Sequence, residues 1–447
     1  MLRLINKLGI KSSPIIRGSF SSFMVRVSGF LLGFCFVLIL TRSLGVGVMG
    51  NYAITITVLN LLSVFGRLGQ DTSTLRYISH YFAFNKTNVS GGIYIQSFCI
   101  ILFTSIVISV LSRFVLVYQD IYQLNDELQG YLLIGIWAIP AISLNALNAQ
   151  VFRAMRKPAL FTFFKFDAVL LLNILGLSIG IYLLGLDVNP VLILLISVCI
   201  TIVINTSLII GSLNLFKNKT YWYSRGLFNK KVIQTGVPML FADATTFLMS
   251  WVDILMLGYF CTSEEVGVYN VAMKVSSFTG VSLFAVNSIS TPKFSQYYNS
   301  GDFDRFKSAV AESTRLIFLT TLPLVVFMLL FSRQIVNLFI GDSSIYLKDL
   351  GSQIVIILGV GLLISALSGS VGNIMNMTGK QTSFRNVILL TLIIKIMLNI
   401  FLISSWGVTG AAYSSAFGTI FWNILCVLLI YRFYKIYTVY IPKINSW

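Results

Sequence analysis

Charged residues and groups that could perform chemistry are scarce in this sequence. Only 11% of its 447 residues are charged and 56% are hydrophobic, whereas a soluble domain carries about 25% charged residues. This composition excludes an ordinary soluble fold and indicates a membrane protein. The one histidine and the five cysteines, none in a Cys-X-X-Cys pair, provide neither a metal site nor a disulfide framework.

Acidic residues are the scarcer of the two charged classes. Asp and Glu total 15 against 32 Lys and Arg, which gives a formal net charge of +17. In a soluble protein such an excess would indicate nucleic-acid binding. Here the basic residues lie in short segments between apolar runs, which indicates membrane topology instead. We therefore expect no nucleic-acid partner.

Nucleotide-binding and catalytic motifs are lacking as well. Gly45 to Gly50 match G-X-G-X-X-G, but this fingerprint needs a preceding strand and a βαβ unit. We interpret the segment as a turn between two membrane helices. The sequence shows no phosphate-binding loop and no Ser/His/Asp set, so we expect no enzyme activity, no catalytic residue and no cofactor.

Long apolar runs are the dominant feature of the chain. A membrane-spanning helix needs about 20 mostly apolar residues, and twelve runs approach or exceed that length. They cover residues 18–40, 52–75, 91–112, 131–152, 159–184, 190–213, 236–260, 267–291, 315–332, 352–377, 386–405 and 409–431. The sequence therefore predicts an all-α polytopic membrane protein with twelve transmembrane helices, the first of them retained rather than cleaved.

Basic residues predict the orientation of these helices. With the N-terminus inside, most Lys and Arg fall in the inner segments. The outer segments hold only Arg42, Arg113, Arg333 and Lys348. Under the positive-inside rule, both termini are then expected in the cytoplasm.

A repeated phrase divides the chain. Gly-X-Tyr followed by an apolar run occurs at Gly50/Tyr52 and again at Gly267/Tyr269. The repetition predicts two halves of six helices with the same orientation and a central cavity between them. The predicted parts are a bundle over 1–215, a basic cytoplasmic linker over 216–232 and a bundle over 233–447.

Ionisable residues fall inside the predicted helices, where a charge facing lipid costs about 2.5–3.5 kcal/mol. Helical spacing places them with other polar residues on single faces, which would line a cavity. The candidates for substrate binding are Arg26, Arg67, Lys274 and Lys395. The candidates for coupling to a proton or a sodium ion are Asp243 and Asp253.

Structural alternatives exist for several of these charges. Arg67 and Asp71 are four residues apart and form either a structural pair or part of a site. Lys165 and Asp167 lie near the predicted inner end of their helix, where we expect them to reach the headgroups.

The overall charge of the cavity favours an anionic ligand. Asp253 and Lys274 are neighbours in one helical hairpin and are candidates to pair across it. The intramembrane bases still outnumber the acids, and Arg and Lys are the usual partners of phosphate groups.

Four segments carry a resemblance to a known family. They are TRSLGVGVMGNYA at the first hairpin, FRAMRKP after the fourth helix, GVPMLFADATTFLMSWVDILMLGYFCTSEEVGVYNVAMKV across the seventh and eighth, and WGVTGAAYSSAFGT entering the twelfth. The chain resembles the polysaccharide-export branch of the multidrug/oligosaccharidyl-lipid/polysaccharide (MOP) exporter superfamily. It is most similar to bacterial O-antigen flippases of the Wzx type.

The resemblance implies a fold and a function. The fold would be MATE-like, with two six-helix bundles around a central cavity. Such proteins are taken to flip undecaprenyl-pyrophosphate-linked O-antigen repeat units from the cytoplasmic to the periplasmic leaflet of the bacterial inner membrane by alternating access. Membrane lipid, an O-antigen polymerase and a chain-length regulator are the implied partners.

The resemblance also implies roles for particular residues. Related lipid II flippases carry basic residues in helices 1, 2 and 8 that engage the pyrophosphate. Arg26, Arg67 and Lys274 lie in those helices and are matched by helix, not by motif.

Two alternative functions remain open at this stage. A cation-coupled multidrug exporter of the same superfamily would share the helices but prefer an acidic cavity. A membrane-embedded polysaccharide polymerase would be expected to show a large outer loop, and the predicted outer loops are short.

Overall fold

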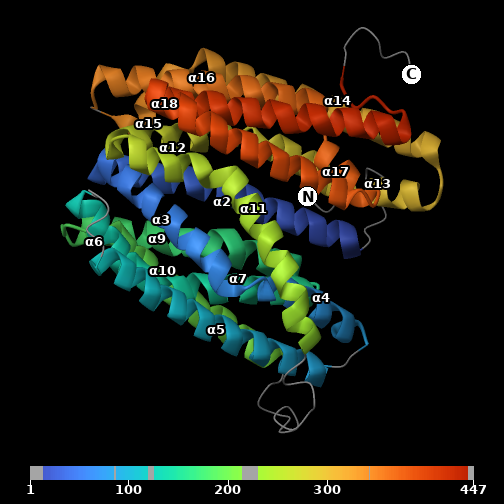
Figure 1. Cartoon of the computed structure of the whole chain (residues 1–447), viewed down its shortest axis with the longest axis horizontal. Coiled ribbons are helices and arrows are strands. Elements are labelled where there is room, and N and C mark those ends of the chain that lie inside the picture. The colour runs from blue at the N-terminus through green and yellow to red at the C-terminus, as the bar shows by residue number, and fades with distance from the viewer. Residues whose placement is uncertain (1–13, 85–86, 119–124, 214–229, 342, 441–447) are drawn as a thin grey trace. The chain divides into compact units, whose positions relative to one another are not determined.

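The computed structural model describes residues 14–84, 87–118, 125–213, 230–341 and 343–440, and every regular element within these ranges is a helix (Figure 1). In chain order the elements are α2 (Pro14–Leu44), α3 (Val46–Arg67), α4 (Gln70–Ala83), α5 (Thr87–Tyr118), α6 (Asp126–Gly135), η1 (Ile136–Ala138), α7 (Ile139–Ala154), α8 (Pro158–Thr162), η2 (Phe163–Asp167), α9 (Ala168–Ser178), η3 (Ile179–Leu183), α10 (Pro190–Leu213), α11 (Lys230–Phe260), α12 (Ser263–Ser277), α13 (Gly280–Asn299), α14 (Phe303–Leu330), α15 (Ser332–Ile340), α16 (Ile345–Ser368), α17 (Val371–Met377) and α18 (Gln381–Tyr434). The predicted all-α class is confirmed.

Ten helices among the described residues are long and apolar enough to cross a membrane. One of them, the 54-residue α18, loses helical dihedral angles at Gly407 (φ 57°, ψ −135°). It therefore holds two predicted helices, 386–405 and 409–431. The predicted helix 267–291 corresponds to α12 and α13, which are separated at Phe278 and Thr279. The arrangement is consistent with twelve crossings.

Several local features differ from the sequence-based expectation. The predicted helix 352–377 is wrong as one continuous helix, because it ends at Ser368 and resumes at Val371 after Gly369, whose φ is positive (72°). The predicted helix 52–75 is wrong as one continuous helix, because Leu68 and Gly69 have positive φ angles and separate α3 from α4. At Gly69 a Cβ atom would overlap the carbonyl oxygen of Gly236 in α11. The break is thus fixed by a close helix contact that the sequence does not show. The nine-residue helix α15 was not expected, since it is too short to span a membrane.

The described helices form two compact units. Unit 1 comprises Met1–Phe36 and Thr55–Ala244, and unit 2 comprises Val37–Ile54 and Thr245–Trp447. Helices α2, α3 and α11 each contribute residues to both units. The predicted division into 1–215 and 233–447 stays a prediction, and most of the predicted linker 216–232 lies outside the described residues.

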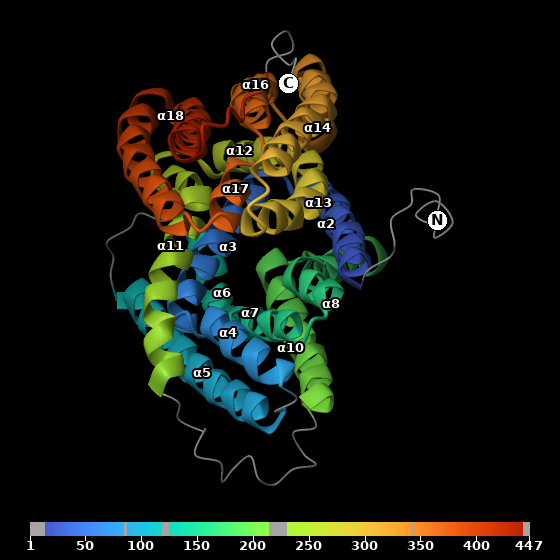
Figure 2. The same ribbon diagram turned by 90° about the vertical axis from the view of Figure 1, so that its right-hand side faces the viewer.

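Unit 1 is built on α4, α5, α7 and α10, which pack side by side (Figure 2). Their apolar faces enclose a core of buried residues: Ile78, Ile93, Tyr94, Ile101, Leu144, Leu147, Val151, Phe152, Ala154, Met155, Phe164, Ala168, Ile209, Leu213 and Val232. Within this core, the ring of Phe164 stacks on Phe152 of α7 with 5.2 Å between centroids. This contact anchors the π-helical turn η2, which carries Lys165 and Asp167.

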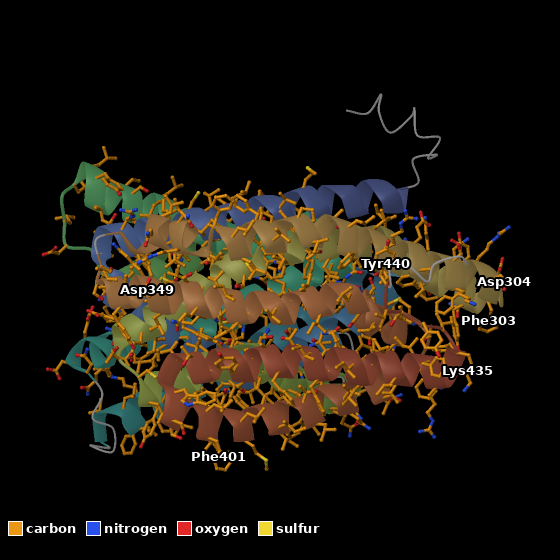
Figure 3. All side chains as sticks on the ribbon, turned by 90° about the horizontal axis from the view of Figure 1, so that it is seen from above. Phe303, Asp304, Asp349, Phe401, Lys435 and Tyr440 are labelled. Atoms are coloured by element: carbon orange, nitrogen blue, oxygen red, sulfur yellow. The ribbon has the colours of Figure 1, made fainter. Side chains whose placement is uncertain are left out.

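Unit 2 is built on α14, α16 and α18, with α12 and α15 also against α16. Asp349 lies at one end of this unit and Asp304 and Lys435 lie at the other (Figure 3). On the flank between those ends, Phe401 points outward and is 70% exposed. Charged ends and an apolar flank are the surfaces expected of helices that cross a bilayer.

Candidate functional site

The break between α3 and α4 carries an ion pair in unit 1. Nη1 of Arg67 lies 3.0 Å from Oδ2 of Asp71, whose side chain is 3% exposed. The Arg67 Nε group also donates to the carbonyl oxygen of Ser63 at 3.2 Å. The pairing suggested by the four-residue spacing is therefore present, and it survives the helix break because the two residues flank it.

A second carboxylate and an amine lie close to this pair. Thr72 of α4 donates its hydroxyl to Oδ2 of Asp243 in α11 at 3.3 Å. Lys165 on η2 interacts electrostatically with Arg67, Asp71 and Asp243. Side chains from the α3–α4 break, α11 and η2 thus converge on one polar region of unit 1.

Arg26 of α2 reaches the same π-helical turn. Its guanidinium carbon lies 3.8 Å from the ring centroid of Phe166 and 5.2 Å from that of Phe30. Asp167 is 1% exposed, and its carboxylate packs directly against Gly29, where a Cβ atom would overlap it. Neither carboxylate oxygen has a hydrogen-bond partner among the described residues. The expectation that Asp167 reaches the headgroups is wrong, because this contact with α2 buries it.

Unit 2 holds a separate buried cluster centred on Asp253. Its Oδ2 atom lies 2.9 Å from Nζ of Lys395, and both side chains are almost fully buried. Three further groups donate hydrogen bonds to the Asp253 carboxylate. They are Asn399 Nδ2 at 2.8 Å, the Tyr269 hydroxyl at 3.0 Å and the Ser415 hydroxyl. An ionised carboxylate is costly inside a membrane protein unless it is paired and hydrogen-bonded in this way.

The Asp253 cluster includes residues that sequence reasoning missed. Tyr269 belongs to the second Gly-X-Tyr phrase, which was interpreted only as a repeat. It is positioned by the capping box of Thr262 and Glu265 at the start of α12. Ser415 lies within the quoted WGVTGAAYSSAFGT segment, but nothing in its spacing indicates a contact with α11.

The predicted binding and coupling residues are thus placed in both units. Arg26, Arg67 and Asp243 lie in unit 1, and Asp253, Lys274 and Lys395 lie in unit 2. Lys274 is half-buried in α12, while Asp253 forms its described ion pair with Lys395. The roles of these six residues in substrate binding and ion coupling stay predictions. No group of three or more His, Cys, Asp or Glu side chains suited to a metal ion occurs in the described part of the chain.

Parts of this chain match two protein families. Residues 15–298 match the family described as "Polysaccharide biosynthesis protein", and residues 238–401 match the family described as MatE. A similar curated protein is the probable low-salt glycan biosynthesis flippase Agl15 of Haloferax volcanii. It is 23% identical over 405 residues, which cover 90% of this chain and 80% of that protein.

Solved structures with a similar fold include two transporters. One is an inward-facing multidrug resistance MATE family transporter of the MOP superfamily, with a TM-score of 0.72 and 15% identity over 92% of this chain and 98% of that one. The other is the lipid II flippase MurJ in an inward closed conformation, with a TM-score of 0.70 and 17% identity over 91% of this chain and 86% of that one. At these identities the likeness shows the fold alone, and it confirms the predicted MATE-like architecture.

Proposed function

We infer a transport function from the premise that this chain belongs to the polysaccharide biosynthesis protein family, within the MOP superfamily of exporters. It is a multi-pass membrane protein. We propose that it moves a lipid-linked glycan across the membrane by alternating access, as a transporter and not as an enzyme.

The observation that carries this proposal is the polar region of unit 1. Lys165 and Arg26 place two cations on or against the π-helical turn η2, near the Arg67–Asp71 ion pair. Charges inside a membrane protein are costly unless they serve a ligand or a partner. Among the described residues Lys165 forms no ion pair, and an anionic phosphate group of a lipid-linked glycan would supply a compensating charge.

The finer assignment extends the resemblance seen in the sequence. The substrate is an undecaprenyl-pyrophosphate-linked O-antigen unit or a similar polysaccharide repeat unit. It moves from the cytoplasmic to the periplasmic leaflet of a bacterial inner membrane, with both termini of the chain in the cytoplasm. The diphosphate meets the basic residues, the glycan occupies the polar interior, and the lipid tail stays in the bilayer. An O-antigen polymerase and a chain-length regulator act next on the product.

Coupling to a proton or a sodium ion is part of the proposal. Of the two predicted carboxylates, Asp253 is neutralised by Lys395, whereas the described side-chain contact of Asp243 is the hydroxyl of Thr72. Asp243 is therefore the better candidate for coupling, because a carboxylate that exchanges a cation has to be accessible to it.

The decisive experiment asks which leaflet holds the lipid-linked glycan. Cells that lack this protein but retain glycan synthesis are converted to spheroplasts and treated with a membrane-impermeant glycan label. We expect the glycan to accumulate unlabelled on the inner face, and the wild-type gene to restore labelling. The Arg26→Ala variant should fail to restore it, while Arg333→Ala should succeed, because Arg333 is 60% exposed and pairs with an exposed Asp349.

Two outcomes would contradict the proposal. Normal labelling in cells without the protein would remove the flippase assignment and leave multidrug export as the leading account. If the wild-type gene does not restore labelling of the accumulated glycan, the defect in translocation lies in another protein. Mass spectrometry of the accumulated lipid identifies the carrier and tests the undecaprenyl assignment separately.

A further inference from the structure

Three cations and two aromatic rings of unit 1 alternate in one continuous series. The guanidinium carbon of Arg153 lies 5.2 Å from the ring centroid of Phe161. The amine of Lys165 lies 5.3 Å from Phe161 and 5.3 Å from Phe166. The guanidinium carbon of Arg26 lies 3.8 Å from the ring centroid of Phe166, so Arg26 is the last member of the series. We name these five residues the ring-held cation series.

Aromatic rings hold a cation without cancelling its charge. The ring attracts the cation through its quadrupole but carries no net charge of its own. A carboxylate, by contrast, neutralises its partner, as in the pairs Arg67–Asp71 and Lys395–Asp253. Among the residues that the structure describes, neither Arg153 nor Lys165 forms an ion pair. Their positive charge therefore remains available to a ligand.

The series leads from the end of a span into its interior. Arg153 is in the last turn of α7 and is exposed. Lys165 follows the start of α8 at Pro158 by seven residues, which is about 10 Å at 1.5 Å per residue. It is also exposed, yet it interacts electrostatically with Arg67, Asp71 and Asp243 from other elements. Lys165 therefore faces the polar region of unit 1, and the π-helical turn places it there.

The cations of this region repel one another. Lys165 is repelled by both Arg67 and Arg153 and attracted by Asp71 and Asp243, but Asp71 is already paired with Arg67. Arg26 is attracted by Asp167. A bound anion with charge on several oxygens would relieve the repulsion and would bridge neighbouring cations.

We propose that the ring-held cation series is a set of adjacent subsites for a diphosphate group, which admit the group at Arg153 and pass it through Lys165 to Arg26. The inference rests on the proposed flippase function and adds an entry route on the side predicted to be cytoplasmic. In this route Lys165 binds the diphosphate directly. Phe161 and Phe166 are positioning residues, since they act through the cations.

The test measures binding of inorganic pyrophosphate to the purified full-length protein by titration calorimetry at constant ionic strength. The Lys165→Gln variant should weaken binding about 10- to 100-fold, as expected for loss of a charge-assisted contact. The Phe161→Leu and Phe166→Leu variants should each weaken it about two- to tenfold. Orthophosphate should bind more weakly than pyrophosphate, because it cannot bridge two subsites.

Matched variants separate the series from general effects of charge or packing. Phe163→Leu removes a ring of the same π-helical turn that packs edge-on against Phe164, and Arg156→Gln removes an exposed cation next to α7. Both should leave binding within about twofold. In the double variant Phe161→Leu/Lys165→Gln, loss of the ring should weaken binding less than it does in the wild type, since the ring then acts only through Arg153.

Failure of this inference is distinguishable from failure of the proposed function. Unchanged pyrophosphate affinity in Lys165→Gln, or equal losses in Phe163→Leu and Arg156→Gln, would overturn the subsites even if the glycan is flipped. Absence of pyrophosphate binding by the wild-type protein would overturn them as well. Binding with the expected pattern in a protein that fails the leaflet assay would retain the subsites and remove the flippase function.

Discussion

The Lys395→Ala substitution is expected to destabilise the protein by about 3–5 kcal/mol, the usual cost of removing one partner of a buried ion pair. Lys395 and Asp253 are 4% and 1% exposed at the side chain, so water cannot replace the lost amine. The measurement is the thermal unfolding midpoint of the detergent-solubilised protein. Lys293→Ala is the control, because that lysine is exposed on α13 and should shift the midpoint little.

The remaining hydrogen-bond partners of Asp253 and Lys395 predict which single variant lowers the thermal midpoint more. Without Lys395, the Asp253 carboxylate keeps its hydrogen bonds from Tyr269, Asn399 and Ser415. With Asp253→Leu, the Lys395 amine keeps the carbonyl oxygen of Met249 at 3.1 Å, a single acceptor. Asp253→Leu should therefore lower the midpoint more than Lys395→Ala. An unchanged midpoint in Lys395→Ala would contradict an ionised buried pair.

Removing both charges distinguishes a structural from a transport role. The double variant Asp253→Leu/Lys395→Met replaces the pair with apolar groups of similar volume and should recover most of the lost stability. If the predicted substrate-binding role of Lys395 is correct, this stable variant will still fail the leaflet assay. Normal flipping by it would remove Lys395 and Asp253 from both of their predicted functional roles.

The sequence predicts contacts well where they are local. Arg67 and Asp71, four residues apart, were expected to form either a structural pair or part of a site, and the ion pair is present although the helix breaks between them. Lys395 was expected on a polar helix face, but its partner Asp253 lies in a helix far away along the chain. Helical periodicity shows which face of a helix is polar and not which other helix that face meets. The Asp253–Lys395 pair therefore needed the structure.

The sequence likewise predicts where helices occur better than it predicts where they break. Apolar length predicted the spanning segments, because the bilayer sets a minimum that each segment must meet. The break at Gly69 depends on the approach of Gly236, and the burial of Asp167 depends on Gly29. The alternation of Arg153, Phe161 and Lys165 likewise arises from the junction of α7 with α8 and the π-helical turn, which the pattern of apolar residues does not reveal.

The two copies of the Gly-X-Tyr phrase contact each other, and substitutions at this contact are expected to destabilise the protein. Gly50 of α3 and Gly267 of α12 both lie in unit 2. A Cβ atom at Gly50 would overlap the carbonyl oxygen of Ser263 and lie 2.9 Å from the Gly267 nitrogen. A Cβ atom at Gly267 would overlap the carbonyl oxygen of Val46. The two copies thus meet backbone to backbone, and the Ser263 hydroxyl donates to Asn51 Oδ1 at 2.6 Å.

Alanine at Gly50 or Gly267 is therefore expected to destabilise the protein by about 1–3 kcal/mol, the usual cost of overpacking. The obstructing atoms belong to the backbone and cannot rotate away. Gly47→Ala is the matched control on the same helix, because its nearest neighbour would be Glu264 Cγ at 3.6 Å. Since alanine favours helix over glycine by up to about 1 kcal/mol, Gly47→Ala should be neutral or stabilising. If the thermal midpoints of Gly50→Ala and Gly47→Ala rise together, helix propensity outweighs the contact, and glycine is not required where the two copies meet.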